Sequence, residues 1–393
     1  MAVPYGLPGE TVLVEPAGAY GRLVEIEAAS ADRVDPFCPY FGRCGGCVFQ
    51  HLDEKAYAIW KHGKVKSSLE AQGLSTRVEP LRDGHGAGRR RMVLHVRPVE
   101  GALRAGFMEA GSHRLVPIEH CPITVPDLYR APKAAEALGE LVRTSGKPLD
   151  VAVTATAGGL DVELRGSGPV DAATRQALIR ASDALDLARL SVHGDVLIER
   201  RAPLLEIGRA HVAPPAGAFL QATARGEETL AAEVVAAARG ARRIADLFSG
   251  IGPFALRLAE TAEVHAVEGQ GAMLAALDRA ARNAPGLRRV TMETRDLFRR
   301  PLLPPELERF DLVVLDPPRQ GADAQVRQIT ASSLERVIMV SCDAGTFARD
   351  AATLATGGFV LERVVPVDQF KWSAHVEIVG VLRRPPKRGK RRR

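Results

Sequence analysis

The sequence contains few cysteines for its length and no long apolar run. Five cysteines among 393 residues are too few for a disulfide framework, and the odd number leaves at least one thiol free. We therefore expect a reducing, cytoplasmic location. The first residues lack the basic and apolar regions of a signal peptide, and no segment approaches the ~18 apolar residues that span a membrane. These absences give no indication of a disulfide-stabilised scaffold or of a membrane role.

The positive charge of the chain is concentrated at its C-terminal end. The formal net charge is +6, but residues 383–393 hold eight Lys or Arg and no acidic residue. The rest of the chain carries a slight excess of acidic residues. A tail of this composition is too charged and too rich in Pro and Gly to fold alone, and such tails attract phosphate backbones. We expect a disordered tail that contacts nucleic acid, with a role in solubility alone as the alternative.

The length and the order of apolar segments both predict several domains. Residues 1–35 contain a few short β-strands, and residues 36–200 mix strand-like segments with two helical stretches, which indicates an α+β domain. Residues 201–382 alternate helices with buried strands. This alternation predicts a Rossmann-like α/β fold with a doubly wound parallel sheet. The strand-like cores lie at 244–248, 264–268, 310–316 and 337–341, and the helical stretches lie near 127–143 and 169–186.

Four of the five cysteines indicate a metal centre. Cys38, Cys44 and Cys47 have the spacing C-x5-C-x2-C in a loop rich in Gly and Pro, where glycine lets the backbone wrap closely around a bound group. Cys121 can supply a fourth thiolate. Four thiolates suit tetrahedral zinc or an iron-sulfur cluster, and the five-residue gap departs from the short paired spacing of structural zinc sites. The alternative is a set of buried thiols without a metal.

A Gly-rich turn at 246–255 lies between a strand and a helix, where backbone amides can approach a ligand. Gly250 and Gly252 form a short Gly-x-Gly pattern, which is weak by itself. Glu268 ends the next strand, 22 residues after the start of the turn, and can accept hydrogen bonds from both ribose hydroxyls of a nucleoside. Asp296 follows the strand after that and is placed to bind an adenine amino group. The pattern favours S-adenosylmethionine over a nicotinamide dinucleotide.

Three further residues occupy strand positions typical of catalytic groups. Asp316 is followed by two prolines, which fix a rigid turn and hold the carboxylate at the crevice. Cys342 ends an apolar strand before a helix start and is a candidate nucleophile, although a lone cysteine there is otherwise buried core. Glu377 lies in a late strand among apolar residues, where a carboxylate is costly unless it is paired or functional. It is therefore either a candidate base or half of a structural ion pair.

Together, these motifs resemble the RNA uracil-5 methyltransferase family in order and spacing over nearly the whole chain. The resemblance implies a four-iron four-sulfur cluster on Cys38, Cys44, Cys47 and Cys121, a nucleophile at Cys342, a base at Glu377, and cofactor contacts from Gln221, Phe248, Gly250, Glu268, Asp296 and Asp316. Gln221 is included because residues 219–221 match the Phe-x-Gln motif of the family. The cluster cysteines most resemble the branch that acts on 23S ribosomal RNA. A monomer that binds RNA is implied, with transfer RNA as the alternative substrate.

The chain departs from the family pattern at several positions. Ser249 replaces a frequent cysteine, Thr223 replaces a frequent Asn, and residues 343–344 replace the frequent Asn-Pro. Pro253 replaces a frequent Asn beside the cofactor, so a contact through this side chain does not carry over. The RNA-binding β-barrel of the family, the TRAM domain, is represented in residues 1–35 only by its later strands. We expect a partial β segment there, through truncation or reduction of the barrel.

The resemblance also implies a mechanism in which the Cys342 thiolate adds to uracil C6, C5 takes the methyl group, and Glu377 removes the C5 proton so that the thiol is eliminated. The target uridine must be flipped or lie in a loop to reach the thiol. Two other classes of function stay open. A non-catalytic iron-sulfur RNA-binding protein gives Cys342 no role, and an exocyclic-amine methyltransferase uses the Asp316 turn without Cys342 or Glu377.

Overall fold

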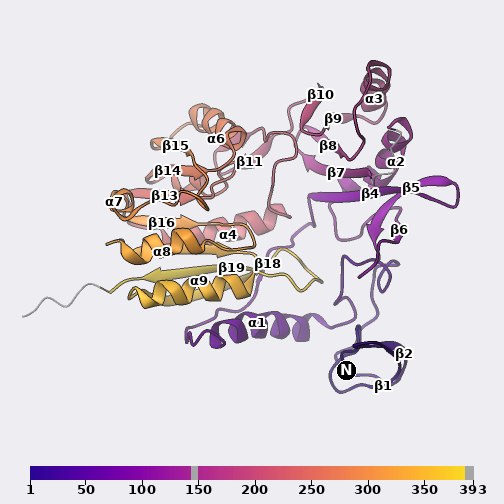
Figure 1. Cartoon of the computed structure of the whole chain (residues 1–393), viewed down its shortest axis with the longest axis horizontal. Helices are drawn as coiled ribbons and strands as arrows, with labels where there is room; N and C mark the ends of the chain where they lie inside the picture. Colours follow the sequence, from indigo (N-terminus) through magenta and orange to yellow (C-terminus); the bar gives the residue numbers. More distant parts are fainter. Residues whose placement is uncertain (143–148, 386–393) are drawn as a thin grey trace, which may run out of the picture.

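The alternating strands and helices of the C-terminal half build most of an eight-stranded sheet (Figure 1). The structure is a computed structural model and describes residues 1–142 and 149–385. The strand order is β15-β14-β13-β16-β17-β19-β18-β3, and the strands from β15 to β17 are parallel to one another. Strand β19 runs antiparallel to both of its neighbours. The predicted doubly wound sheet is confirmed, with one antiparallel strand in addition. The strands span Arg82–Asp83 (β3), Arg243–Leu247 (β13), Glu263–Glu268 (β14), Val290–Thr294 (β15), Leu312–Leu315 (β16), Arg336–Ser341 (β17), Val360–Asp368 (β18) and Glu377–Arg383 (β19).

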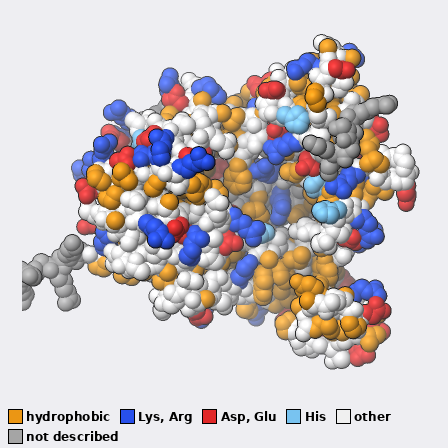
Figure 2. All heavy atoms as spheres, in the orientation of Figure 1, with side chains coloured by type: hydrophobic (Ala, Val, Ile, Leu, Met, Phe, Trp, Pro, Cys, Tyr) orange, Lys and Arg blue, Asp and Glu red, His pale blue; other side chains and the backbone are white. Residues whose placement is uncertain are grey.

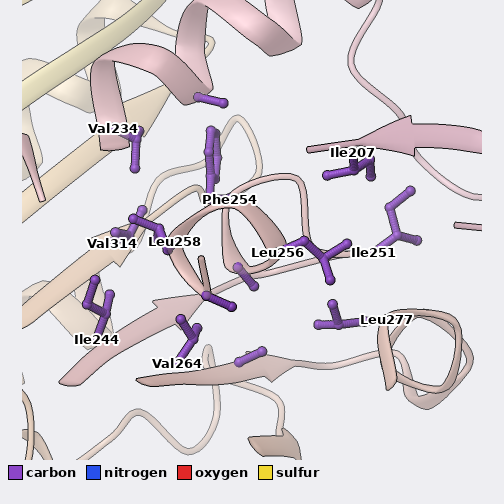
Figure 3. Packing of buried hydrophobic residues seen from close by; sticks show 14 of the residues in the cluster. Ile207, Val234, Ile244, Ile251, Phe254, Leu256, Leu258, Val264, Leu277 and Val314 are labelled. Atoms are coloured by element: carbon purple, nitrogen blue, oxygen red, sulfur yellow. The ribbon is translucent and has the colours of Figure 1, made fainter. Parts of the chain in front are cut away.

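Helices cover both faces of this sheet, and each face has its own apolar core. The four residues of β16 are all buried and alternate between the two cores, because successive side chains of a strand point to opposite faces. Such a strand is a continuous apolar run, which makes it recognisable in the sequence. Figure 3 shows one core, where Ile244, Val264 and Val314 of three strands lie near Leu258 and Phe254. The helices span Glu54–Glu70 (α1), Ala224–Ala237 (α4), Ala255–Leu258 (α5), Gly271–Asn283 (α6), Pro304–Leu307 (α7), Asp323–Ala331 (α8) and Ala344–Thr356 (α9).

The middle of the chain forms a second sheet of seven strands, in the order β10-β9-β8-β7-β4-β5-β6. Its strand pairs are antiparallel except for β8 and β9, and helices α2 and α3 pack against it and against each other. Both helices lie within the predicted helical stretches, although residue 143 of the first stretch falls outside the described residues. The elements span Arg91–Val99 (β4), Ala102–Met108 (β5), Leu115–Pro117 (β6), Pro126–Arg130 (3-10 helix η1), Ala131–Leu141 (α2), Leu149–Thr156 (β7), Gly159–Arg165 (β8), Ala172–Ala184 (α3), Leu187–Val192 (β9) and Asp195–Glu199 (β10).

The N-terminal segment is a hairpin of β1 (Thr11–Ala17) and β2 (Tyr20–Ala28), which lies apart from both large sheets in Figure 1. Gly18 in its turn has a φ of +67°, in the left-handed region that favours glycine. Helix α1 then packs on α9, and β3 joins the large sheet beside β18. Residues 54–83 therefore belong in space to the C-terminal sheet, although they precede the middle sheet in sequence.

Two short elements complete the described chain. Strands β11 (Leu205–Ile207) and β12 (Ala210–Val212) form a small hairpin, and β12 contacts α6. Most of the predicted basic tail, residues 386–393, lies outside the described residues. Within the described part, no helix is both long enough and apolar enough to cross a membrane.

Candidate active site

Every residue expected to bind the cofactor or to take part in catalysis lines one cavity of about 720 Å³. These residues are Gln221, Phe248, Gly250, Glu268, Asp296, Asp316, Cys342 and Glu377. Several of them follow the carboxyl ends of β13, β14, β16 and β17, where the strand order reverses between β13 and β16. Open α/β sheets bind ligands at this switch point. Figure 2 shows a hollow between the two large parts of the molecule, with Lys and Arg side chains in and around it.

Glu268, at the end of β14, is held by two backbone amides. The Gly250 N–H donates to Oε2 at 3.1 Å, and the Gln270 N–H donates to Oε1 at 3.0 Å. Each carboxylate oxygen keeps acceptor capacity for a ligand hydroxyl. Phe248 has a φ of +64°, which is unusual for a residue with a side chain, and its ring centroid lies 5.3 Å from that of Phe298. Strained backbone of this kind clusters at ligand sites, and the two rings give the cavity an apolar wall.

Cys342 and Glu377 come from adjacent antiparallel strands. Ser341, the last residue of β17, pairs with Ile378 of β19. The next position along each strand therefore brings Cys342 opposite Glu377, at the same edge of the sheet. Both residues line the large cavity. The structure thus places a thiol and a carboxylate together that lie far apart in the sequence.

Buried acidic groups around Cys342 favour the protonated thiol. Burial first, and then the charges of Glu377 and Asp316, raise the pKa of the Cys342 thiol to about 11. Burial and the charge of Asp316 raise the pKa of Glu377 to about 8, against a hydrogen bond from Gln369 that lowers it. Burial raises the pKa of Asp316 to about 7. A cation bound beside these groups would lower all three pKa values, because opposite charge favours each ionised form.

Asp246, the start of the Gly-rich turn, is a further buried carboxyl, but it does not itself line the cavity. Its side chain is fully buried, and neither oxygen has a hydrogen-bond partner among the described residues. Burial, followed by the charge of Asp316, raises the pKa of Asp246 well above its ordinary value. An unpartnered buried carboxylate is costly, so burial favours the protonated form of Asp246.

Gln369, in the loop between β18 and β19, connects two of the expected site residues. Its Nε2 donates to Gln221 Oε1 at 2.6 Å and to Glu377 Oε1 at 2.8 Å. Its Oε1 accepts from the Ala222 N–H at 3.0 Å, and the side chain is fully buried. Sequence analysis missed this residue, because a glutamine in a loop carries no pattern and two of its partners are almost 150 residues away.

The departures from the family pattern have local explanations. Thr223 Oγ1 accepts from the Gly226 N–H at 2.9 Å and caps helix α4, and Asp343 caps helix α9 in the same way. Ser249 and Pro253 both line the large cavity. The Ser249 hydroxyl is buried without a partner among the described residues. Two of the departures therefore serve helix starts, and two shape the cavity wall.

The four cysteines expected to hold a metal group line a second cavity, of about 280 Å³. Burial raises the pKa of Cys47 to about 11 and that of Cys121 to about 12. Among the described residues, no three His, Cys, Asp or Glu side chains are grouped so that they could hold a single metal ion. Gln50 and Arg89 also line this cavity, and within the described part Gln50 Nε2 and Arg89 Nε are buried without a hydrogen-bond partner. Unsatisfied donors of this kind suit an acceptor that fills the cavity.

The strand order, the antiparallel strand β19 and the cavity at the switch point are those of a Rossmann-like methyltransferase fold. Residues 213–385 match the family described as tRNA (Uracil-5-)-methyltransferase. An uncharacterised RNA methyltransferase of Brucella suis is 44% identical over 380 residues, which cover 97% of this chain and 92% of that protein. The 23S rRNA (uracil(1939)-C(5))-methyltransferase RlmD of Chromohalobacter salexigens is 33% identical over 409 residues, which cover 99% of this chain and 85% of RlmD.

The chain therefore belongs to the RNA uracil-5 methyltransferase family, whose members are S-adenosylmethionine-dependent enzymes. The structure of Pyrococcus abyssi tRNA (uracil-54, C5)-methyltransferase with S-adenosyl-L-homocysteine has the same overall fold. The TM-score is 0.77 at 20% identity, and the superposition covers 97% of this chain and 94% of the other. The family predicted from the motifs is confirmed.

Proposed function

We propose that this chain forms 5-methyluridine in 23S ribosomal RNA, with Cys342 as the nucleophile and Glu377 as the base. The observation that carries the proposal is that both residues line the same cavity as the residues expected to hold S-adenosylmethionine. The ribosomal substrate is supported by RlmD, because its similarity extends over 99% of this chain at 33% identity. The transfer RNA enzyme of Pyrococcus abyssi is 20% identical, which supports a common fold rather than a common substrate.

The chemistry needs a nucleophile because uracil C5 is too unreactive to take a methyl group unaided. The Cys342 thiolate adds to C6, and the electrons of the C5–C6 double bond give C5 enolate character. S-adenosylmethionine, when bound, would carry a positive sulfonium charge and supply its methyl group to C5, with cleavage of the sulfur–methyl bond and departure of neutral S-adenosylhomocysteine. Glu377 then removes the C5 proton, the electrons of the C–H bond re-form the double bond, and the Cys342 sulfur leaves C6.

The charges around Cys342 support this sequence of steps. Without a cation nearby, burial and then the neighbouring acids keep the thiol protonated, with its pKa at about 11. Asp316 and Glu377, whose pKa values are raised to about 7 and about 8, are themselves stabilised in their ionised forms by a positive ligand. A sulfonium charge in this cavity therefore favours the thiolate. Activation of the nucleophile is coupled to binding of the methyl donor.

The cavity of Cys38, Cys44, Cys47 and Cys121 is proposed to hold a four-iron four-sulfur cluster. All four cysteines line this cavity, and its volume of about 280 Å³ gives room for a polynuclear group. The unsatisfied donors of Gln50 and Arg89 suit sulfide acceptors. The cysteine loop also contacts the loop before Glu377, since the Val48 and Phe49 amides donate to Trp372 O at 2.8 and 3.1 Å. We propose that the cluster supports the wall of the active site.

The other regions are proposed to bind RNA. Residues 1–35 are proposed as a partial TRAM-like segment, because the β1–β2 hairpin exposes Leu13, Tyr20 and Val24. Residues 36–200 are proposed as the cluster domain and residues 201–382 as the methyltransferase domain, with α1 and β3 of the first segment packed against the sheet of the second. The basic tail at 383–393 is proposed to contact phosphates.

The test is methyl transfer from labelled S-adenosylmethionine to unmodified 23S and transfer RNAs, with nucleoside mass spectrometry of the products. We expect 5-methyluridine in 23S RNA, no turnover by Cys342→Ala, and a covalent protein–RNA adduct that accumulates with Glu377→Gln. The exposed Glu335 provides a control, because Glu335→Gln should behave as the wild type. Full turnover by Cys342→Ala, or a label on an exocyclic amine, would overturn the mechanism. If the label appeared in transfer RNA alone, transfer RNA would be the substrate in place of 23S ribosomal RNA.

A further inference from the structure

Gln369 is enclosed by groups that restrict its side chain. It is fully buried between β18 and β19. A Cβ at Gly226 would lie 2.6 Å from Gln369 Cβ, and a Cβ at Gly84 would lie 3.0 Å from the Gln369 backbone nitrogen. Asp368, the preceding residue, forms a buried ion pair with Lys61. The backbone and the side chain of Gln369 therefore have little space in which to move.

The hydrogen bonds of Gln369 permit only one orientation of its amide. Oε1 accepts from the Ala222 N–H, whereas Nε2 donates to oxygens of Gln221 and Glu377. A rotation by 180° would place the amide oxygen against the Glu377 carboxylate and an N–H against the Ala222 N–H. All three hydrogen bonds would be lost, so the network assigns the orientation.

This orientation also fixes the two residues on either side. Gln221 accepts through Oε1, so the hydrogens of its own Nε2 are left for groups in the cavity that it lines. Glu377 accepts through Oε1, and its second oxygen is left for a ligand in the same cavity. One buried amide therefore sets the orientation of a donor and an acceptor whose residues line the cavity.

We propose that Gln369 is a positioning residue for removal of the C5 proton, which holds one oxygen of Glu377 and turns the donor side of the Gln221 amide into the cavity. The proposal rests on the roles proposed above for Cys342 and Glu377. The free oxygen of Glu377 takes the C5 proton, the electrons of the C–H bond re-form the C5–C6 double bond, and the Cys342 sulfur departs. The Gln369 N–H also stabilises the ionised base, because it opposes the rise in pKa that burial causes.

The test compares Gln369→Leu with Gln325→Leu. Gln325 is equally buried, accepts from the Leu302 N–H at 2.8 Å and donates to Leu302 O at 3.1 Å, but it does not line the cavity. We expect Gln369→Leu to lower kcat by roughly 10- to 100-fold, a larger effect than the rise in the KM for S-adenosylmethionine that loss of the Gln221 contact causes. The covalent RNA adduct should accumulate, and the rise of activity with pH should move to higher pH. Gln325→Leu should show neither effect.

A second variant, Gln369→Glu, keeps the size of the side chain and the acceptor for Ala222. It places another carboxyl beside Glu377, so the rise of activity should again move to higher pH. One outcome would overturn the positioning role and leave the mechanism intact. In that outcome, both Gln369 variants show the wild-type pH dependence and no adduct, while Glu377→Gln accumulates the adduct. Absence of the adduct in Glu377→Gln would overturn the mechanism itself.

Discussion

Lys61 and Asp368 are 307 residues apart in the chain and form a buried ion pair. Lys61 Nζ also donates to Phe370 O at 3.1 Å, and the Tyr57 hydroxyl accepts from the Trp372 N–H at 2.8 Å. Helix α1 thereby holds the loop that joins β18 to β19. This loop contains the positioning glutamine and leads directly to the candidate base. The geometry of the active site therefore depends on a helix that precedes the middle sheet in sequence.

Replacing Lys61 by Met should destabilise the protein by about 3–5 kcal/mol, because the charge of Asp368 would stay buried without a partner. The double variant Lys61→Met with Asp368→Asn should recover most of this loss, since no unpaired charge remains. Urea unfolding at pH 7 measures the free energy of unfolding of the single and the double variant. Lys66→Met is the control, because the Lys66–Glu70 pair of the same helix is exposed and contributes little. Equal stability of the Lys61 and Lys66 variants would contradict the prediction.

The Cys342 thiol should titrate at about pH 11 in the free protein, and at lower pH when a cation occupies the cavity. The difference in thiolate absorbance between the wild type and Cys342→Ser isolates this one cysteine. Sinefungin carries a positive amine in place of the sulfonium, whereas S-adenosylhomocysteine is neutral there. The pH midpoint of the Cys342 titration should therefore fall more with sinefungin than with S-adenosylhomocysteine. Equal midpoints with the two ligands would show that charge does not activate the thiol.

Glu268→Gln should weaken binding of S-adenosylhomocysteine by roughly 10- to 100-fold. Each carboxylate oxygen of Glu268 accepts a hydrogen bond from a backbone N–H, so the amide nitrogen of a glutamine at either oxygen position would face another donor. Isothermal titration calorimetry gives the affinity. Glu263 begins the same strand and is exposed, so Glu263→Gln should bind as the wild type does. An unchanged affinity in Glu268→Gln would remove this residue from the cofactor site.

If the proposed cluster is present, Cys121→Ser should lose most of the bound iron and sulfide, because it removes one of the four proposed ligands. Protein purified without oxygen should contain about four iron and four sulfide per chain. Cys342→Ser should keep the full amount, since Cys342 lies in the other cavity. The thermal midpoint of Cys121→Ser should also fall, because an unfilled cavity leaves buried donors unsatisfied. Zinc without sulfide in the wild type would contradict the cluster.

The parts of the site that depend on local pattern were predictable from the sequence. Strand β16 is buried on both faces, so the sequence shows it as an apolar run that ends at Asp316 and two prolines. The turn with Phe248 and Gly250 is marked by its glycines. The residues expected to bind S-adenosylmethionine or to take part in catalysis all line one cavity, the four cysteines line another, and their individual roles stay predictions. Asp246 was passed over because its burial depends on the strands on either side of it.

The sequence by itself determined which residues end strands and start helices, because apolar runs, prolines, glycines and caps act over a few residues. Only the tertiary structure decided which of these ends meet. Glu377 faces Cys342 because β19 pairs antiparallel between β17 and β18, a placement that nothing in its own segment encodes. Gln369 and Lys61 bond to partners 148 and 307 residues away. The partner of a buried polar side chain is set by the packing of distant segments, so only the folded chain defines it.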